Sequence, residues 1–323
     1  MPDVKIIIAL PAYNEAANIG AVLQALTAEH WPWPAEIIVI DDGSTDGTAA
    51  VVNNQTGVKL LPHQKNRGLG RVFQTASDHA LDSGATVMVF FDADGQFEVT
   101  EIKQVVEPLI KRQADFVLGS RFLTDGQLAV PLVKRWGNKV LASFISLVTG
   151  QRVSDTACGF RAYSRESLLR LNNKTDFTYT QEVLLELIFK GLTFQEVPVR
   201  VKYFNQRQSA ISSNLWRYGW LVFKIIFRTV RDYKPLKFFG WIGGFLFVAG
   251  LILDIWMFNH FFQTGKFTPY KIVGFAGAFL NFIGLTIWFI GLVADMLNRI
   301  RRIQEEQLYL NKKNVYNDRD VHS

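Results

Sequence analysis

The sequence predicts an α/β domain with a Rossmann-like mixed, mainly parallel sheet, followed by interfacial helices and two transmembrane helices. Three observations lead to this fold class. Short apolar runs alternate with helical patterns over the first 200 residues, polar clusters follow the ends of those runs, and two long apolar stretches come later in the chain. With 323 residues, of which 49 % are apolar and 20 % charged, the composition is typical of a folded protein with a substantial core.

Predicted strands and helices alternate in the first part of the chain. Four short β-branched or aromatic runs predict strands at Lys5–Leu10, Glu36–Asp41, Val87–Phe91 and Asp115–Leu118. Helical patterns begin near Glu15 and cover Leu69–Ser83 and Glu101–Arg112. Apolar strands separated by helices indicate a mainly parallel sheet that is covered on both faces. Ligands of such sheets bind beyond the carboxyl ends of the strands.

Two apolar stretches predict membrane-spanning helices. Phe238–Phe258 contains Asp254 as its only charged residue, and Ile272–Ala294 contains none. Each reaches the roughly 20 residues that a helix needs to cross the hydrocarbon core of a bilayer. A buried helical hairpin of a soluble protein is the alternative, but two such stretches in succession favour transmembrane helices.

The distribution of charge predicts the orientation of the spans. Basic residues precede the first span and follow the second: Arg228, Arg231, Lys234, Lys237, Arg299, Arg301 and Arg302. The connecting loop contains Lys266 and Lys271. The positive-inside rule therefore predicts a two-pass protein of the cell membrane with both termini and the α/β domain in the cytoplasm. Because no charged segment followed by an apolar one opens the chain, we expect no signal peptide.

These features divide the chain into four parts. We expect an α/β domain at 1–210, an amphipathic interfacial helix region at 211–237, a two-helix transmembrane hairpin at 238–296, and a cytoplasmic tail at 297–323 that is either a short helix or disordered. Asn214–Tyr233 interleaves Trp, Leu, Phe and Ile with Arg and Lys, as helices at a membrane interface do. A helix packed in the core of the α/β domain is the alternative.

Two aspartates directly follow the predicted strand Val87–Phe91. Asp92 and Asp94 stand at alternate positions, so in an extended chain their carboxylates point the same way. Two carboxylates this close repel each other unless a divalent cation lies between them. Mg²⁺ or Mn²⁺ held in this way would also bind a diphosphate. An ordinary acidic turn is the alternative, because Asp and Gly are common in turns.

Six motifs, in order along the chain, resemble the family 2 glycosyltransferases, which are inverting enzymes with the GT-A fold. The motifs are Pro11-Ala-Tyr-Asn-Glu15, Asp41-Asp-Gly-Ser-Thr-Asp46, Phe90-Phe-Asp-Ala-Asp-Gly-Gln96, Gly119-Ser-Arg121, Asp155-Thr-Ala-Cys-Gly-Phe-Arg161 and Glu196-Val-Pro-Val199. Together they resemble the branch that includes dolichyl-phosphate mannosyltransferases and bacterial polyprenyl-phosphate glycosyltransferases with paired C-terminal membrane helices. The motifs cover about residues 4–210, and the remainder matches in architecture only.

The resemblance implies which residues bind the nucleotide sugar. The implied nucleotide-sugar positions are Pro11, Tyr13, Glu15, Asp42 and Asp92, with Asp42 at a base edge and Asp41 supporting its turn. Asp92, Asp94 and Gln96 match the metal and diphosphate positions, and Asp94 is also a candidate catalytic residue.

The resemblance also implies a site for an acceptor phosphate. Arg121 matches an arginine that meets a lipid phosphate, and Arg135 falls where a second is expected. The later basic pattern is Lys202…Arg207-Gln-Ser209, whereas the family more often has Arg-x-x-Gly-x-Ser, so which basic residue contacts phosphate there stays open. Arg121 paired with a structural carboxylate and Arg135 on a solvated helix face are the alternatives.

Asp155 is a candidate base or acceptor-positioning group, and a turn cap is its structural alternative. A phosphomonoester acceptor needs no base, because its second pKa is about 6 and it is mostly a dianion at neutral pH. Cys158 is the only cysteine, which excludes an internal disulfide, and we expect it to be a small buried residue. The five histidines show no metal-ligand spacing, and no role is assigned to them.

The resemblance implies a membrane-bound inverting glycosyltransferase that moves a sugar from a UDP- or GDP-sugar to undecaprenyl or dolichyl phosphate, for cell-envelope glycan or glycolipid modification. A processive polysaccharide or glycolipid synthase is one alternative, although Leu132-Val-Lys-Arg-Trp136 lacks the glutamine of the Gln-x-x-Arg-Trp motif. A non-catalytic nucleotide-sugar-binding membrane subunit is another, and the intact Asp92, Asp94 and Gln96 argue against it. The lipid bilayer is an expected partner, a homo-oligomer is possible, and basic residues that bracket membrane spans argue against nucleic acid.

Overall fold

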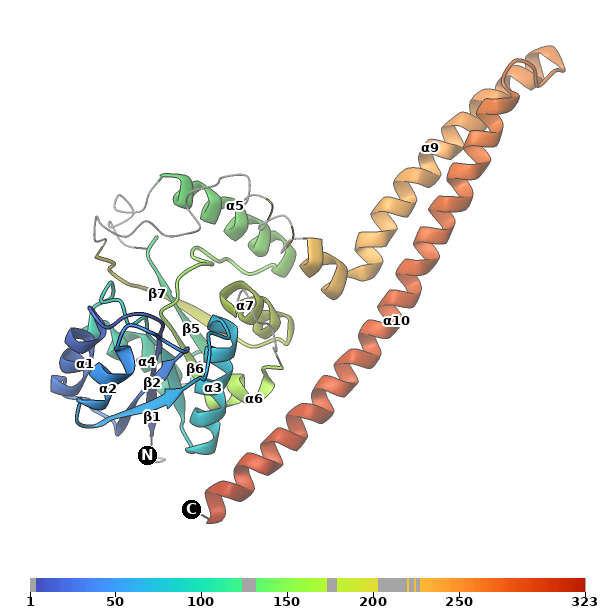
Figure 1. Ribbon diagram of the computed structural model, residues 1–323. Helices are drawn as coiled ribbons and strands as arrows, with labels where there is room; N and C mark the ends of the chain where they lie inside the picture. Colours follow the sequence, from blue (N-terminus) through green and yellow to red (C-terminus); the bar gives the residue numbers. More distant parts are fainter. Residues whose placement is uncertain are drawn as a thin grey trace. The chain divides into compact units, whose positions relative to one another are not determined.

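The computed structural model describes residues 4–123, 132–172, 179–202, 220, 224 and 227–322. Its strands are β1 (Ile6–Ala12), β2 (Ala35–Asp41), β3 (Val58–Pro62), β4 (Val87–Phe90), β5 (Phe116–Ser120), β6 (Arg161–Ser164) and β7 (Phe194–Pro198). They form one seven-stranded sheet in the order β3-β2-β1-β4-β6-β5-β7 (Figure 1). Neighbouring strands are parallel except where β6 pairs with β4 and β5. The predicted mixed, mainly parallel sheet is therefore confirmed.

Helices cover both faces of this sheet. They are α1 (Ile19–Ala28), α2 (Thr48–Asn53), α3 (Leu69–Asp82), α4 (Ile102–Ile110), α5 (Leu132–Thr149), α6 (Arg165–Arg170) and α7 (Tyr179–Phe189), with a 3₁₀ turn at Val99–Glu101. Helices α1, α2 and α4 lie on one face, and α3, α6 and α7 lie on the other (Figure 1). Both faces of β1 are therefore buried, which explains why its first five residues are all apolar.

Three strands were not among the predicted runs, and one helix begins later than predicted. The strands β3 and β7 are sheet edges with partly exposed residues, and β6 has only four residues, so none has a long apolar run. Helix α1 begins at Ile19 rather than near Glu15. The reason is local, because Asn14 has a left-handed φ of 56° and the backbone N–H groups of Glu15 and Ala16 bond to Thr48 and Asp46.

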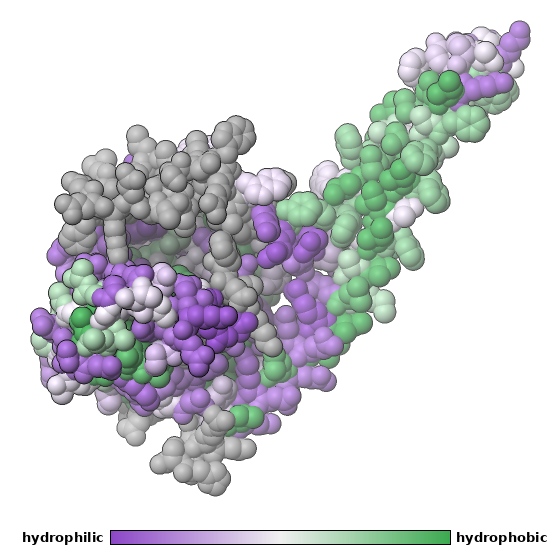
Figure 2. Space-filling view, viewed as in Figure 1, coloured by the Kyte–Doolittle hydropathy of each residue, from purple (hydrophilic) through white to green (hydrophobic). Residues whose placement is uncertain are grey.

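Two long apolar helices follow, α9 (Pro235–Thr264) and α10 (Lys271–His322). They include both predicted spans, and both are long and apolar enough to cross a membrane. Only 11 % and 17 % of the residues in their most apolar windows are buried. Figure 2 shows apolar residues gathered along this hairpin. A core hairpin of a soluble protein would be mostly buried, so this exposure favours a membrane environment.

The two apolar helices approach each other closely at glycines. A Cβ atom on Gly243 would lie 2.6 Å from the carbonyl oxygen of Gly284, and one on Gly250 would lie 2.6 Å from that of Gly277. Small residues of this kind allow close helix packing in membranes. The carboxylate of Asp254, the one charge in the first predicted span, accepts a hydrogen bond from Asn281 Nδ2 at 2.6 Å. This bond gives one oxygen of the Asp254 carboxylate a partner within the hairpin.

The chain forms two compact units, and the first contains two separate pieces of sequence. One unit comprises Met1–Tyr218 together with Gln307–Ser323, and the other comprises Gly219–Glu306. Within the first unit, Tyr309 of α10 is buried, and its hydroxyl donates to Glu166 Oε2 at 3.0 Å. Arg170 lies over the Tyr309 ring at 4.2 Å, and Lys312 Nζ donates to the carbonyl of Leu171 at 2.6 Å. The expected tail is thus helical as far as His322, and its residues near Tyr309 pack on α6.

The interfacial helix expected at 211–237 lies largely outside the described residues.

Candidate active site

A pocket of about 360 Å³ opens where β1, β2 and β4 end. We call it the carboxylate pocket, and it contains six residues that the sequence predicted for nucleotide-sugar or metal binding: Pro11, Tyr13, Glu15, Asp42, Asp92 and Asp94. The opposite wall comes from Asn66, Gly68, Leu69 and Val72, in the β3–α3 loop and α3. The topology explains this gathering, because the carboxyl ends of neighbouring parallel strands meet at one edge of a sheet.

The loops after β1 and β2 are tied together by side-chain to backbone hydrogen bonds. The backbone N–H of Asn14 donates to Ser44 Oγ at 2.9 Å, and that of Thr45 donates to Asn14 Oδ1 at 2.9 Å. Asp41 Oδ1 accepts the backbone N–H of Ser44 at 3.0 Å, so Asp41 supports its turn as expected. These bonds fix the backbone that presents Tyr13, which is 47 % exposed at the mouth of the pocket.

Asp42 is buried and organises the opposite wall. Its carboxylate accepts the backbone N–H groups of Arg67 at 2.9 Å and Gly68 at 2.8 Å. Gly68 has a φ of 86°, which L residues with side chains rarely adopt. Asp42 therefore joins the end of β2 to the β3–α3 loop at the pocket.

Asp92 lies at the base of the carboxylate pocket. Burial, followed by repulsion from Asp94, raises the pKa of Asp92 to about 7, although Arg121 and Arg161 act in the opposite direction. The carboxylate packs on Gly159, where a Cβ atom would lie 2.7 Å from Asp92 Oδ2. Any larger residue at position 159 would displace it. Asp94 is oriented by the backbone N–H of Gln96, which donates to its Oδ1 at 3.1 Å.

These carboxylates fit a divalent cation that is shared with an anionic ligand. Their oxygens are the donors that Mg²⁺ and Mn²⁺ prefer, and the raised pKa of Asp92 indicates that a positive neighbour would stabilise its charged form. Among the described residues, no group of three or more His, Cys, Asp or Glu side chains could hold a metal alone. Water and a bound diphosphate would therefore have to supply the remaining ligands.

Arg121 and Asp155 form a two-point ion pair beyond the end of β5. Nε of Arg121 donates to Asp155 Oδ2 at 2.7 Å, and Nη2 donates to Oδ1 at 2.9 Å. Asp155 has no exposed side-chain surface, whereas 19 % of the Arg121 side chain is exposed. The backbone N–H groups of Arg121, Ala157 and Cys158 also donate to the Asp155 carboxylate. Both oxygens of Asp155 are therefore engaged inside the protein.

Glu196 of β7 supports the loop that carries Asp155. Its Oε1 accepts the backbone N–H groups of Ser154 at 2.8 Å and Asp155 at 3.1 Å. Burial raises the pKa of Glu196, while these two hydrogen bonds act to lower it. The Glu196 motif thus connects the edge strand to the arginine site through the 154–155 backbone.

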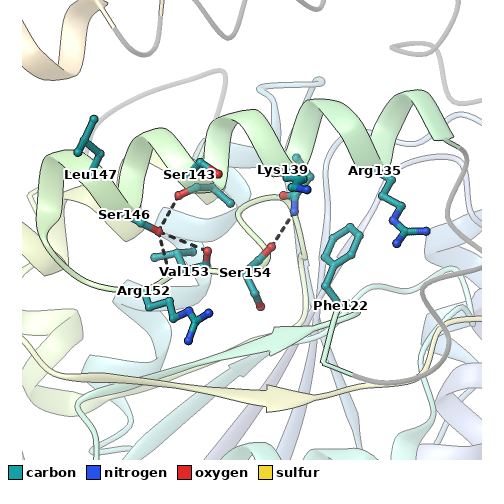
Figure 3. Close-up of a pocket in the computed structure, with 11 residues that line it drawn as sticks. Phe122, Arg135, Lys139, Ser143, Ser146, Leu147, Arg152, Val153 and Ser154 are labelled. Carbon is teal, nitrogen blue, oxygen red and sulfur yellow. Dashed lines mark hydrogen bonds between the residues drawn. The ribbon is translucent and has the colours of Figure 1, made fainter.

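A second pocket, of about 630 Å³, lies between α5 and the segment Arg152–Ser154. Its described lining includes the basic residues Arg135, Lys139 and Arg152, and it contains no acidic side chain. We call it the basic pocket. In Figure 3, Arg135 and Arg152 lie toward opposite ends of it, with Phe122 and Ser154 between them. Arg135 therefore lines the basic pocket.

Lys202, another predicted phosphate contact, lies elsewhere. Lys202 forms an ion pair with Glu98, with Nζ 2.6 Å from Oε1, and 64 % of its side chain is exposed. It lines neither the carboxylate pocket nor the basic pocket. Arg207 and Ser209 lie outside the described residues.

Sequence reasoning assigned no role to two buried residues near the site. Arg161 is fully buried, and its guanidinium donates to the carbonyl oxygens of Cys158, Thr156 and Thr180. Its place at the end of the Asp155–Arg161 motif was the available signal. His63, whose ring contacts Asp42, had no such signal, because it belongs to none of the six motifs.

The sheet order, the paired carboxylates at its edge and the adjoining arginine define a glycosyltransferase domain of the GT-A type. The family model for glycosyl transferase family 2 matches residues 7–171, and the model for the GtrB C-terminal hairpin matches residues 234–300. The chain belongs to glycosyl transferase family 2 and is a glycosyltransferase, as the motifs predicted. Together with the two exposed apolar helices, the hairpin match associates the protein with a membrane.

Relatives and solved structures agree with this assignment. Glycosyltransferase AglJ of Haloferax volcanii is 27 % identical over 311 residues, which cover 95 % of this chain and 98 % of that protein. The UDP-N-acetylglucosamine–dolichyl-phosphate N-acetylglucosaminyltransferase of Methanococcus voltae is 30 % identical, over 63 % of this chain and 88 % of that protein. Glucosyl-3-phosphoglycerate synthase of Mycobacterium tuberculosis, solved with Mn²⁺ and UDP, has a TM-score of 0.53 at 21 % identity, covering 71 % of this chain and 80 % of that one. This last likeness supports the fold.

Proposed function

We propose that this glycosyltransferase moves a sugar from a nucleotide diphosphate sugar to a polyprenyl phosphate at a membrane surface. One observation carries the proposal. The carboxylate pocket and the Arg121–Asp155 pair belong to the same edge of the sheet, and Arg121 is near enough to act on the pKa of Asp92. The site thus combines acidic groups suited to a cation-bound diphosphate with a cation suited to a second phosphate. The Methanococcus voltae relative is named as a dolichyl-phosphate N-acetylglucosaminyltransferase, and this name supports a polyprenyl phosphate acceptor.

The carboxylate pocket is the donor side of the proposed site. Pro11, Tyr13 and Glu15 would contact the nucleotide, and Asp42 would accept a hydrogen bond from the base edge. A Mg²⁺ or Mn²⁺ ion held by Asp92 and Asp94 would neutralise the charge that develops on the departing nucleoside diphosphate. Gln96 supports this end of the site through the backbone N–H that orients Asp94.

Arg121 is the acceptor side of the proposed site. An oxygen of the acceptor phosphate attacks the anomeric carbon, while the bond from that carbon to the donor diphosphate breaks and the nucleoside diphosphate leaves. Because the acceptor is already a dianion, no proton has to be removed. Arg121 offsets the repulsion between the two anionic substrates, and its planar guanidinium suits phosphate geometry. We therefore assign Asp155 the positioning of Arg121, rather than the role of a base.

The basic pocket extends the acceptor side. Arg135, Lys139 and Arg152 give it a positive lining, while Phe122 and Leu147 add apolar surface. A polyprenyl phosphate has the same two characters, an anionic head and an apolar chain. This match supports the predicted assignment of Arg135 to the acceptor phosphate. The basic flanks of the apolar helices support a cytoplasmic catalytic domain. A homo-oligomer stays a prediction.

The test is a transfer assay with the full chain in lipid nanodiscs. A panel of UDP- and GDP-sugars is supplied with polyprenyl phosphate and Mg²⁺ or Mn²⁺, and the lipid product is identified by mass spectrometry. We expect one donor to give polyprenyl phosphate carrying a single sugar. The matched control is polyprenol without the phosphate, which should give no product.

Other outcomes would select another function. Equal transfer to polyprenol would refute the phosphate acceptor, and a growing polymer would identify a processive synthase. Donor binding without transfer to any lipid would favour a non-catalytic subunit.

A further inference from the structure

His63 occupies a fixed position behind the carboxylate pocket. It follows β3 directly, and its backbone N–H donates to the carbonyl oxygen of Asp41 at 2.8 Å, which continues the pairing of β2 and β3 beyond Pro62. Only 8 % of its side chain is exposed, and it does not line the pocket. The backbone of His63 is therefore held by the sheet, and its ring does not line the pocket.

The ring of His63 bridges Asp42 and helix α3. Nδ1 lies 2.7 Å from Asp42 Oδ1, and Nε2 lies 2.9 Å from Thr75 Oγ1. An ionised carboxylate only accepts hydrogen bonds, so the proton must be on Nδ1. A threonine hydroxyl can donate or accept, and it therefore satisfies Nε2. The chemistry of Asp42 thus fixes the direction of the first bond.

The bond from His63 restrains Asp42, the pocket carboxylate that is assigned to the nucleobase. Asp42 Oδ1 accepts from both His63 and the backbone N–H of Arg67, and Oδ2 accepts from that of Gly68. Rotation of the carboxylate about its last side-chain torsion would break all three bonds. Two of the donors belong to the loop that forms the opposite wall, so they move whenever that loop moves. His63 is the donor anchored on the sheet.

We propose that His63 is a positioning residue for nucleotide binding, acting through Asp42. By holding Oδ1, it keeps the carboxylate turned so that Oδ2 faces the base edge of the donor. The inference rests on the proposed function, because it takes from it the assignment of Asp42 to the nucleotide. It adds a residue that none of the six motifs contains.

Two substitutions at position 63 separate the two bonds of the ring. In His63→Asn, the side-chain amide nitrogen takes the place of Nδ1 and can still donate to Asp42. In His63→Gln, the amide nitrogen takes the place of Nε2 and reaches toward Thr75 instead. Thr75→Val removes only the α3 partner and serves as the matched control.

The measurement is the Kd of UDP and GDP for the full chain in nanodiscs with Mg²⁺, together with KM for the donor and for polyprenyl phosphate. We expect His63→Gln to raise the nucleotide Kd and the donor KM about tenfold, as when one hydrogen bond to a charged group is lost. The KM for the acceptor should not change. His63→Asn and Thr75→Val should stay within about twofold of the wild type, because the donor to Asp42 remains.

The outcomes distinguish a positioning role of His63 in nucleotide binding from a purely structural role. If Asn and Gln raise the nucleotide Kd equally, or if all three variants only lower the melting temperature, His63 is a structural tie between β3 and α3 and the inference is wrong. In either case the wild type still binds nucleotide and the proposed function stands. If the wild type itself binds neither UDP nor GDP, the proposed function fails first.

Discussion

Arg121 and Asp155 face each other edge to edge, with both oxygens of the carboxylate bonded to nitrogens of one guanidinium at 2.7 and 2.9 Å. Asp155 is fully buried, and its carboxylate is bonded by this partner and by nearby backbone N–H groups. The pair fixes the plane of the arginine, and a phosphate would meet an arginine that is already oriented. The two residues should therefore act as one unit in acceptor binding.

Loss of Arg121 should weaken use of the acceptor more than use of the donor. We expect Arg121→Ala to raise the acceptor KM roughly 10- to 150-fold, the effect of one charge-assisted contact. Arg121→Lys should restore part of this, because lysine keeps the charge without the fork. Steady-state kinetics with each substrate varied in turn would measure both. A loss confined to the donor KM would move Arg121 to the nucleotide side.

A double substitution separates this role from folding. Arg121→Ala leaves a buried carboxylate without its partner, which should destabilise the protein by about 3–5 kcal/mol. Adding Asp155→Asn removes that buried charge, so the melting temperature should recover while the acceptor KM stays high. Recovery of both would mean that Arg121 acts only on stability.

Asp94→Asn should strongly weaken cation-dependent nucleotide binding. Removal of one of two carboxylates should weaken the cation about 100-fold or more, since even indirect ligand partners contribute 10- to 100-fold. Titration of Mn²⁺ in the presence of UDP or GDP would measure it. Glu107→Gln is the matched control, because Glu107 is an exposed carboxylate of α4 that pairs with Lys111 just after the helix. Transfer that persists in excess chelator would refute the metal role.

Glu196→Gln should change how stability depends on pH. Burial raises the pKa of Glu196, so its favourable contribution is complete below its unfolded pKa and is lost as the pH rises through the folded value. Glutamine keeps an oxygen for Ser154 and Asp155 but does not titrate. The melting temperature of the variant relative to the wild type should therefore increase as the pH rises from about 4.5, the ordinary glutamate value, toward neutral. A constant difference over this range would contradict the prediction.

Cys158 should not react with thiol reagents in the folded protein. Burial raises the pKa of its thiol to about 12, and only 1 % of the residue is exposed. Because the chain has no other cysteine, labelling with a maleimide followed by intact-mass analysis would report this residue alone. We expect labelling only in denaturant. Rapid labelling at neutral pH would show that the loop of Asp155 opens in the native state.

Tyr309 should contribute to the stability of the sheet-containing unit, although it lies far along the chain from its partners on α6. Tyr309→Phe removes the bond to Glu166 and should cost about 0.5–1.5 kcal/mol. Tyr309→Ala also removes the ring under Arg170, so its effect should be larger. The free energy of unfolding of both variants can be measured by titration with denaturant, with labelling of Cys158 as the signal of unfolding. Leu310→Ala is the control on the same helix, because Leu310 is 50 % exposed, and equal effects of all three would contradict the prediction.

The sequence predicted best the features that depend on neighbouring residues in the chain. Asp92 and Asp94 were located because parallel strands place their following loops at one edge, and the apolar helices were located by composition alone. β6 was missed because it has only four residues. Its antiparallel pairing depends on where the chain returns to the sheet after α5, and no local pattern in so short a strand indicates this. His63 was missed because its role depends on contacts with Asp42, 21 residues before it, and with Thr75, 12 residues after it. The docking of Tyr309 on α6 joins residues separated by 143 positions, and no local pattern indicates it.

The two-piece composition of the first unit also sets an order of assembly. Residues from Gln307 onward are made only after Gly219–Glu306, which contains both apolar segments, has been synthesised. Tyr309 and Lys312 can therefore reach α6 only after the hairpin has been synthesised. The α6 surface that Tyr309 covers therefore stays uncovered until both apolar helices have been made.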